Sequence, residues 1–195
     1  MIVSLDLLQQ CAPNVAPITM IAIIKTESKY NPWAIGLNKG KKLRYQPHSL
    51  EQAEAWVTYL EKNGYDFDIG LGQVNIRNVH KYGYNATQLL TPCLNLKVAS
   101  DILQKNYKKA FYKTNHPRDA LMMAISAYNT GNYHAGFSNG YVDRVVNNAS
   151  SSKTKPPYNN IHHNKRVDYA NIQSSYGKIK LKTIKPNLDV EYANN

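Results

Sequence analysis

The sequence of 195 residues predicts a mainly α-helical domain followed by a polar tail. Apolar residues recur at helical spacing in several segments that begin at capping residues or prolines. Between these segments lies one short, glycine-rich apolar stretch, and nothing in the pattern indicates alternating strands and helices. With 43% hydrophobic residues, the chain has enough apolar material for one sizeable core.

The N-terminal part predicts two helices. Ser4 can cap a short helix that ends near Cys11, and a second helix spans about residues 17–28, where the following Asn-Pro pair stops it. Residues 33–48 are predicted to form a loop.

A third helix begins at the capping box of residues 49–52 and ends at Gly64. Its apolar side is expected to carry Ala53, Trp56, Val57 and Leu60. Residues 65–75 are short, apolar and rich in glycine, so they predict a loop or a small β-hairpin and not a helix.

The pattern returns to helices after this stretch. A short helix is expected near residues 76–82, a long one over about 95–112, another over about 117–129 and a last one over about 140–147. We therefore interpret residues 1–146 as one helical domain.

The composition changes at Asn147. Residues 147–195 form a basic linker and tail rich in Asn, Ser and Lys, without clean helical periodicity. The tail either binds a partner protein or only improves solubility, and the sequence leaves both interpretations open.

The chain carries 24 Lys and Arg against 13 Asp and Glu, a formal net charge of +11. This excess favours an anionic polymer as partner, although a basic surface without a ligand is the plain alternative. No basic stripe or reading motif indicates direct binding of nucleic acid. Mean hydropathy is −0.52 and no apolar run approaches the roughly 18 residues of a membrane span, so we expect no transmembrane segment.

The two cysteines, Cys11 and Cys93, are either buried and reduced or joined as a disulfide. No cysteine or histidine shows metal-ligand spacing, so we expect no metal site and no cofactor. The first six residues lack the features of a signal peptide, which leaves the route of export open.

Glu27 is the first candidate for chemistry. It lies in the last turn of an apolar helix, on the side of Met20, Ile23 and Ile24. An apolar setting and the nearby helix C-terminus would both raise the pKa of this carboxyl, as a general acid for glycoside cleavage requires. The alternative is a solvated carboxylate turned outward beside Lys25.

Four motifs follow one another along the chain. Glu27 opens Glu-Ser-x-x-Asn-Pro-x-Ala-Ile-Gly; residues 70–73 read Gly-Leu-Gly-Gln; residues 127–132 read Ala-Tyr-Asn-Thr-Gly-Asn; and residues 140–145 read Gly-Tyr-Val-x-Arg-Val. In this order they resemble the soluble lytic transglycosylases, relatives of goose-type lysozyme, and in particular the specialised enzymes of type IV secretion and conjugation systems. The resemblance covers about residues 4–146.

The resemblance implies a lysozyme-like fold with a groove for peptidoglycan glycan strands. It implies that Glu27 is the catalytic acid and then base, and that a further set of residues binds substrate: Ser28, Gly70, Leu71, Gln73, Tyr128, Asn129 and Tyr141. The broader family usually has methionine where this chain has Gly72, a difference expected to widen the groove locally.

The implied reaction cleaves the β-1,4 bond from N-acetylmuramic acid to N-acetylglucosamine and leaves a 1,6-anhydro ring. Such an enzyme would open the cell wall locally in the periplasm for a secretion or conjugation apparatus, which the tail could contact. Because peptidoglycan lies in an oxidising compartment, we then expect a Cys11–Cys93 disulfide.

Two alternatives remain at the level of sequence. Asp66 or Asp68 could serve a hydrolytic mechanism, because an ordinary glycosidase needs two carboxylates. A non-catalytic peptidoglycan-binding scaffold could use the same groove without cleaving the glycan.

Overall fold

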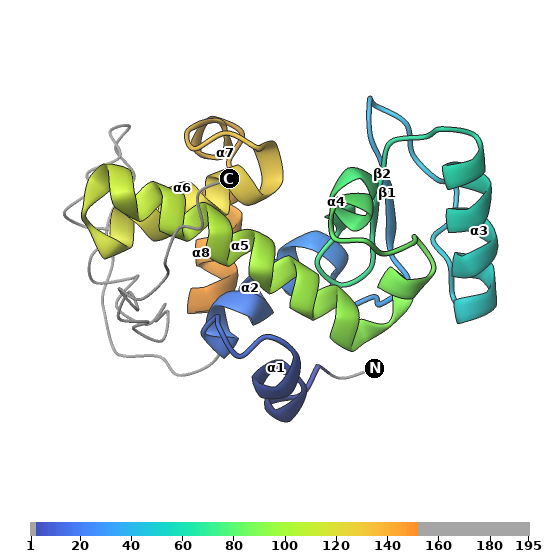
Figure 1. Ribbon diagram of the computed structural model, residues 1–195, viewed down its shortest axis with the longest axis horizontal. Coiled ribbons are helices and arrows are strands. Elements are labelled where there is room, and N and C mark those ends of the chain that lie inside the picture. The colour runs from blue at the N-terminus through green and yellow to red at the C-terminus, as the bar shows by residue number, and fades with distance from the viewer. Residues whose placement is uncertain (1–2, 152–195) are drawn as a thin grey trace, which may run out of the picture.

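The long helix α5 (Pro92–Thr114) runs through the middle of the computed structural model, which describes residues 3–151 (Figure 1). It packs along α6 (Pro117–Thr130) and also contacts α1 (Leu5–Cys11) and the short 3-10 helix η1 (Gln88–Leu90). Helix α5 thus connects the first helix of the chain with the helices of its second half.

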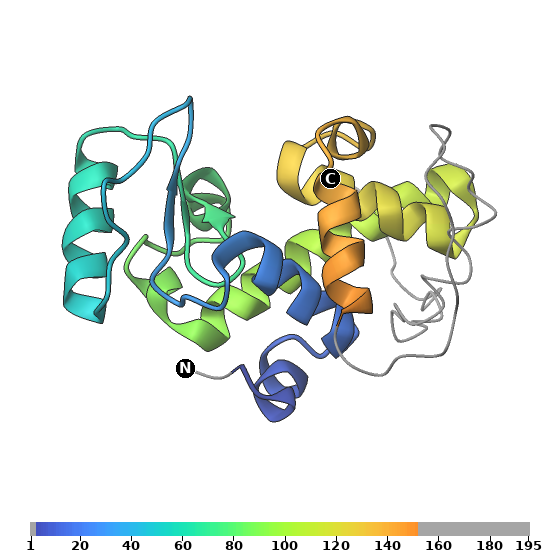
Figure 2. The ribbon, with the colours of Figure 1, turned by 180° about the vertical axis from the view of Figure 1, so that it is seen from behind.

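Helices α2 (Pro17–Ser28) and α8 (Tyr141–Ser150) lie side by side although they are distant in sequence (Figure 2). The middle of α2 is fully buried at Met20, Ala22, Ile23 and Ile24. On α8, Val142 and Val145 are equally buried. The short helix α7 (Ala135–Ser138) connects α6 to α8 and packs against both. Burial of these apolar side chains holds the last helix against the second.

A small antiparallel sheet lies on one side of the molecule, in the order β1 (Ile35–Leu37), β2 (Phe67–Ile69) and β3 (Val74–Asn75). Ile35 pairs with Ile69, and Asp68 pairs with Asn75. Helix α3 (Leu50–Lys62) forms the outer edge of this side, and α4 (Ile76–Lys81) follows β3 directly (Figure 1).

The predicted mainly α-helical class, with a hairpin at the glycine-rich motif, is confirmed. The expected N-cap forms at α3, since Ser49 Oγ accepts a bond from the Gln52 N–H (3.3 Å). The Gln52 side chain accepts its bond from the His48 N–H (3.0 Å), one residue before the N-cap, and not from Ser49 as a capping box requires. Two further predictions about local structure were wrong.

Trp56 was predicted on the apolar side of α3, but it is 39% exposed and does not share the buried side of this helix. The predicted loop of residues 33–48 contains β1, which is too short to give a periodic signal.

Helix α8 is longer than its pattern predicts. It continues through Ser150, Ala149 is buried, and the Asn148 side-chain amide donates a bond to Thr26 Oγ1 on α2 (2.9 Å). The predicted linker therefore begins too early, because residues 147–150 belong to the helix. The rest of the predicted tail, residues 152–195, lies outside the described residues.

A disulfide joins Cys11 at the end of α1 to Cys93 at the start of α5, with a Cα–Cα distance of 5.1 Å. It confirms the expected pairing and links segments that are 82 residues apart. Within residues 3–151, no helix has the length and hydropathy of a membrane span.

Truncation tests where the folded domain ends. We expect a chain ending at Ser151 to keep the thermal stability of the full chain. A chain ending at Asn147 loses the Asn148–Thr26 bond and the burial of Ala149, and should lose about 1–3 kcal/mol of unfolding free energy. Denaturant unfolding of both truncations measures the difference, and equal stability would show that residues 148–151 contribute nothing.

Removal of the disulfide tests its contribution to the fold. We expect the double variant Cys11→Ala/Cys93→Ala to lose about 2–4 kcal/mol of unfolding free energy, because the bridge restricts a loop of 82 residues in the unfolded chain. Urea unfolding measures the loss. Thiol titration of the denatured, oxidatively purified wild type should detect no free thiol, and two thiols per chain would contradict the bridge.

Candidate active site

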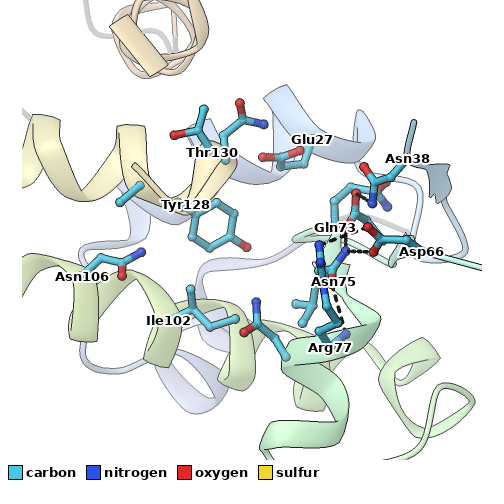
Figure 3. Close-up of a pocket in the computed structure, with 16 residues that line it drawn as sticks. Glu27, Asn38, Asp66, Gln73, Asn75, Arg77, Ile102, Asn106, Tyr128 and Thr130 are labelled. Atoms are coloured by element: carbon cyan, nitrogen blue, oxygen red, sulfur yellow. Dashed lines mark hydrogen bonds and ion pairs between the residues drawn. The ribbon is translucent and has the colours of Figure 1, made fainter. Parts of the chain in front are cut away.

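A groove of about 500 Å³ lies between the sheet and the helices α5 and α6. Glu27 reaches it from the end of α2, Asn38 from the end of β1, and Tyr128 and Asn129 from the end of α6. Figure 3 shows Tyr128 on one side of the pocket and Gln73 on the other, with Glu27 at its edge. The groove is lined mainly by amide, hydroxyl and carboxylate groups, which can form hydrogen bonds with a polar ligand.

Glu27 is half-buried at the end of α2, where this helix packs on α8. Tyr141, only 2% exposed, donates a hydrogen bond from its hydroxyl to Glu27 Oε1. Burial raises the pKa of Glu27 to about 7; the bond from Tyr141 opposes this, the negative charge of Asp68 adds to it, and the positive charge of Arg144 lowers it. The carboxyl can therefore hold a proton near neutral pH, unlike a solvated glutamate.

A network of carboxylates and amides forms the sheet side of the groove. The Asn75 amide donates to Asp66 Oδ1 and Asp68 Oδ1 (both 2.8 Å), and the Asn38 amide donates to Asp68 Oδ2 (3.2 Å). Arg77 forms an ion pair with Asp66 (3.0 Å). Burial raises the pKa of Asp68 above its ordinary value, while these amide bonds oppose the increase.

The amide of Gln73 is fixed by the backbone around it. Its Nε2 donates to Ala34 O (3.0 Å) and to Gly70 O (2.9 Å), so both amide hydrogens are used within the protein. A Cβ atom on Gly36 would lie 2.6 Å from Gln73 Oε1, so Gly36 must lack a side chain for this arrangement. The oxygen of the amide is then the atom that can accept a bond from a ligand.

Asn95 of α5 fastens the glycine-rich loop to the long helix. Its Nδ2 donates to Ile69 O (2.8 Å) and Leu89 O (2.9 Å), and its Oδ1 accepts from the Gly72 N–H (2.8 Å). The residue is only 1% exposed, so these bonds form away from water and satisfy the whole amide. Asn95 thereby fixes the backbone on which Gln73 stands.

Tyr128 holds the same loop from the opposite side. Its hydroxyl donates to Gly72 O (2.6 Å), and a Cβ atom on Gly72 would lie 2.7 Å from Ala99 Cβ and 2.9 Å from the Tyr128 oxygen. The space beside Gly72 is therefore filled by these side chains. The expected local widening of the groove at this glycine was wrong.

Comparison with known proteins identifies the family. The family model described as "Transglycosylase SLT domain" matches residues 7–151. The chain belongs to the SLT-domain transglycosylases. It is a lytic transglycosylase, as the four motifs predict.

Named relatives of this transglycosylase include "Type IV secretion system protein virB1" of Brucella abortus, 44% identical over 162 residues that cover 80% of this chain and 67% of the relative. "Protein virB1" of Rhizobium radiobacter is 36% identical over 172 residues, covering 86% of this chain and 71% of the relative. No solved structure gave a significant match.

The transglycosylase fold brings four of the predicted site residues to the groove: Glu27, Gln73, Tyr128 and Asn129. Tyr141 contacts Glu27 without lining the groove itself. The expectation that Ser28 and Leu71 line it does not agree with their burial, since Leu71 is in the hydrophobic core and Ser28 Oγ donates to Ile24 O (3.1 Å). Gly70 (φ +74°) shapes the loop, with no room for a Cβ atom next to Asn95.

Several groove residues were missed from the sequence: Asn38, Asn75, Arg77, Asn78, Ile102 and Asn106. Asn95 was missed as well, although a polar residue on the buried side of a helix is a detectable signal. Among residues 3–151, no group of three or more His, Cys, Asp or Glu side chains is arranged to hold a metal ion.

Substitution of Asn95 tests the attachment of the loop. We expect Asn95→Ala to lose at least about 2 kcal/mol of unfolding free energy, because the buried Gly72 N–H loses its Asn95 acceptor and the carbonyls of Ile69 and Leu89 each lose a donor. Denaturant unfolding measures the loss. Asn106→Ala on the same helix is the control, expected to cost under about 1 kcal/mol because Asn106 lines the open groove. Equal losses would contradict the assignment.

Proposed function

We propose that the protein cleaves the β-1,4 bond from N-acetylmuramic acid to N-acetylglucosamine in peptidoglycan and forms a 1,6-anhydro product, with Glu27 as acid and then base. The observation that carries this proposal is the half-buried Glu27 carboxyl, whose pKa of about 7 lets it keep a proton at the edge of a polar groove. Family membership supports the class of reaction.

In the first step, Glu27 donates its proton to the glycosidic oxygen as the bond to the sugar carbon breaks. The acetamido group of the substrate stabilises the cationic centre that develops on that carbon. Tyr141 is placed to stabilise the new carboxylate, because its hydroxyl already donates to Glu27 Oε1.

In the second step, the Glu27 carboxylate removes the proton from the 6-hydroxyl of the same sugar, and that oxygen bonds to the cationic carbon. The proton returns to Glu27 and no water is consumed. Because the hydroxyl belongs to the same molecule, its effective concentration is high and no positioned water is needed.

We assign substrate contacts to the amide groups of the groove. Gln73 Oε1 and the side chain of Asn129 are suited to hydroxyl and acetamido groups of the glycan. Tyr128 is a positioning residue in this proposal, since its hydroxyl holds the Gly72 carbonyl.

Hydrolysis of the same bond is the second candidate, and Asp68 is the observation that favours it. This carboxylate lines the groove near Glu27 and has a raised pKa. Both of its oxygens, however, accept bonds from asparagine amides of the sheet side, which orient the carboxylate within that network. This restraint favours Asp68 as a structural and electrostatic group, and the product mass distinguishes the two reactions.

We further propose that the enzyme acts in the periplasm to open the wall for a type IV secretion or conjugation apparatus. The Brucella relative is named as a type IV secretion system protein, and this supports the proposed setting. The disulfide agrees with an oxidising compartment.

Glu27→Gln tests the assignment of the acid. We expect cleavage of purified peptidoglycan to fall by at least about 100-fold while binding is retained, because the variant keeps the shape but has no transferable proton. Mass spectrometry of wild-type products should give anhydro fragments. Products heavier by one water would favour hydrolysis, and wild-type protein that binds without cleaving would favour a scaffold.

The dependence of the rate on pH tests the environment of Glu27. The free enzyme must be protonated, so kcat/KM should fall as pH rises through about 7. Arg144→Gln removes a positive charge that lowers the pKa of Glu27, so it should move this decline to higher pH. Asp68→Asn should move it to lower pH, and shifts in the same direction would contradict the assignment.

A further inference from the structure

A second hollow of about 680 Å³ lies between α3 and the segment that precedes it, separate from the groove. Its walls include Tyr45, His48, Gln52, Trp56 and Tyr59, which we call the α3 shelf, and it shares no lining residue with the groove. Tyr45 is 69% exposed, Tyr59 53% and Trp56 39%. Such a group of exposed large aromatic side chains on one surface is typical of a binding site.

The α3 shelf is preformed. Gln46 bonds to both backbone groups of Ile35 on β1, with Nε2 to the carbonyl and Oε1 from the N–H, each at 2.9 Å. These bonds hold the segment that carries Tyr45 and His48 against the sheet. The rings of Trp56 and Tyr59 stand edge to face, with centroids 6.1 Å apart and planes at 85° to each other.

Charge is distributed unevenly around the α3 shelf. The exposed loop before it carries Lys41, Lys42 and Arg44, and the Arg44 guanidinium lies 5.3 Å from the centre of the Tyr45 ring.

The acidic residues of α3 lie apart from the shelf. One side of the helix carries Gln52, Trp56 and Tyr59 at helical spacing. The exposed acids Glu51 and Glu54 fall on a different side of the helix. The shelf is thus bordered by cations and suits an anionic ligand with flat apolar faces.

We propose that the α3 shelf binds a second segment of peptidoglycan, an amino-sugar polymer that carries carboxylates, outside the catalytic groove. This inference rests on the proposed function for the identity of the polymer. Pyranose rings present an apolar face that can pack on Trp56 and Tyr59, while the Tyr45 hydroxyl, His48 and Gln52 offer polar atoms to hydroxyl and acetamido groups. The carboxylates of the polymer can pair with Lys41 and Arg44.

A second contact with the same polymer changes how the enzyme uses long substrates. Once the α3 shelf holds one segment, another segment meets the groove at a raised effective concentration. A short fragment that fills only the groove gains nothing from this. The α3 shelf should therefore raise apparent affinity for polymer and leave cleavage of short fragments unchanged.

Tryptophan fluorescence gives a direct test, because Trp33 is the one tryptophan of the chain besides Trp56. In the full-length Glu27→Gln/Trp33→Phe variant, Trp56 is the only tryptophan and the glycan is not cleaved. We expect soluble, peptide-bearing peptidoglycan strands to shift its emission and reduce its quenching by acrylamide. No change at concentrations that saturate binding in a sedimentation assay would overturn the proposal.

Activity variants test the consequence in the wild-type Glu27 background. Trp56→Ala should raise KM for polymeric peptidoglycan by about tenfold and leave kcat/KM for short fragments unchanged. Trp56→Phe should restore most of the loss, and Lys41→Gln/Arg44→Gln should weaken polymer binding mainly at low salt. Tyr112→Ala, which removes an 83% exposed tyrosine on α5, is the matched control and should change nothing.

The outcomes separate the two proposals. Equal loss on polymer and on short fragments, or no loss on either, would overturn the α3 shelf as a glycan site while cleavage itself persists. Failure of wild type to cleave any peptidoglycan would instead overturn the proposed function. Capture of a purified secretion protein by the wild type but not by Trp56→Ala, with glycan binding unchanged, would overturn the glycan assignment in favour of a protein partner.

Discussion

One carboxyl group kept from water beside an open polar groove is the constraint on which the site depends. In the proposed mechanism, the groove admits a hydrated polymer, whereas Glu27 is desolvated enough to keep its proton. The packing of α8 on α2 reconciles these requirements, because it brings Tyr141 and Arg144 to the carboxyl from the side away from the groove. Burial raises the pKa of Glu27, while the Tyr141 bond and the Arg144 charge lower it, so the pKa lies near neutrality.

The rest of the fold positions backbone around that carboxyl. Helix α5 supplies Asn95 and α6 supplies Tyr128, and both hold Gly72, one by its N–H and the other by its carbonyl. The loop is thus fixed by side chains from two helices, not by strand pairing alone. A short sheet is sufficient here because its most important turn is anchored from outside the sheet.

The sequence predicted most helices because their signals are local. Ser4, Ser49 and the prolines at the starts of α2 and α6 act within a few residues, and the structure has helices where they indicate. The strand β1 has three residues and gives no periodic signal. Trp56 was placed on the wrong side of α3 because an apolar residue at the boundary of a helical stripe can face either way. Asn38 and Asn75 act through tertiary contacts, which local pattern does not encode.

The bond between Tyr141 and Glu27 joins residues that are 114 positions apart, so the order of synthesis matters. A chain emerges N-terminus first, and Glu27 is present long before α8 exists. Until α8 packs on α2, the carboxyl remains hydrated and its pKa stays close to the ordinary value of a glutamate. A nascent or partly folded chain therefore holds the proton of Glu27 poorly at neutral pH. The raised pKa of Glu27 is therefore a property of the completed domain, acquired only when α8 is in place.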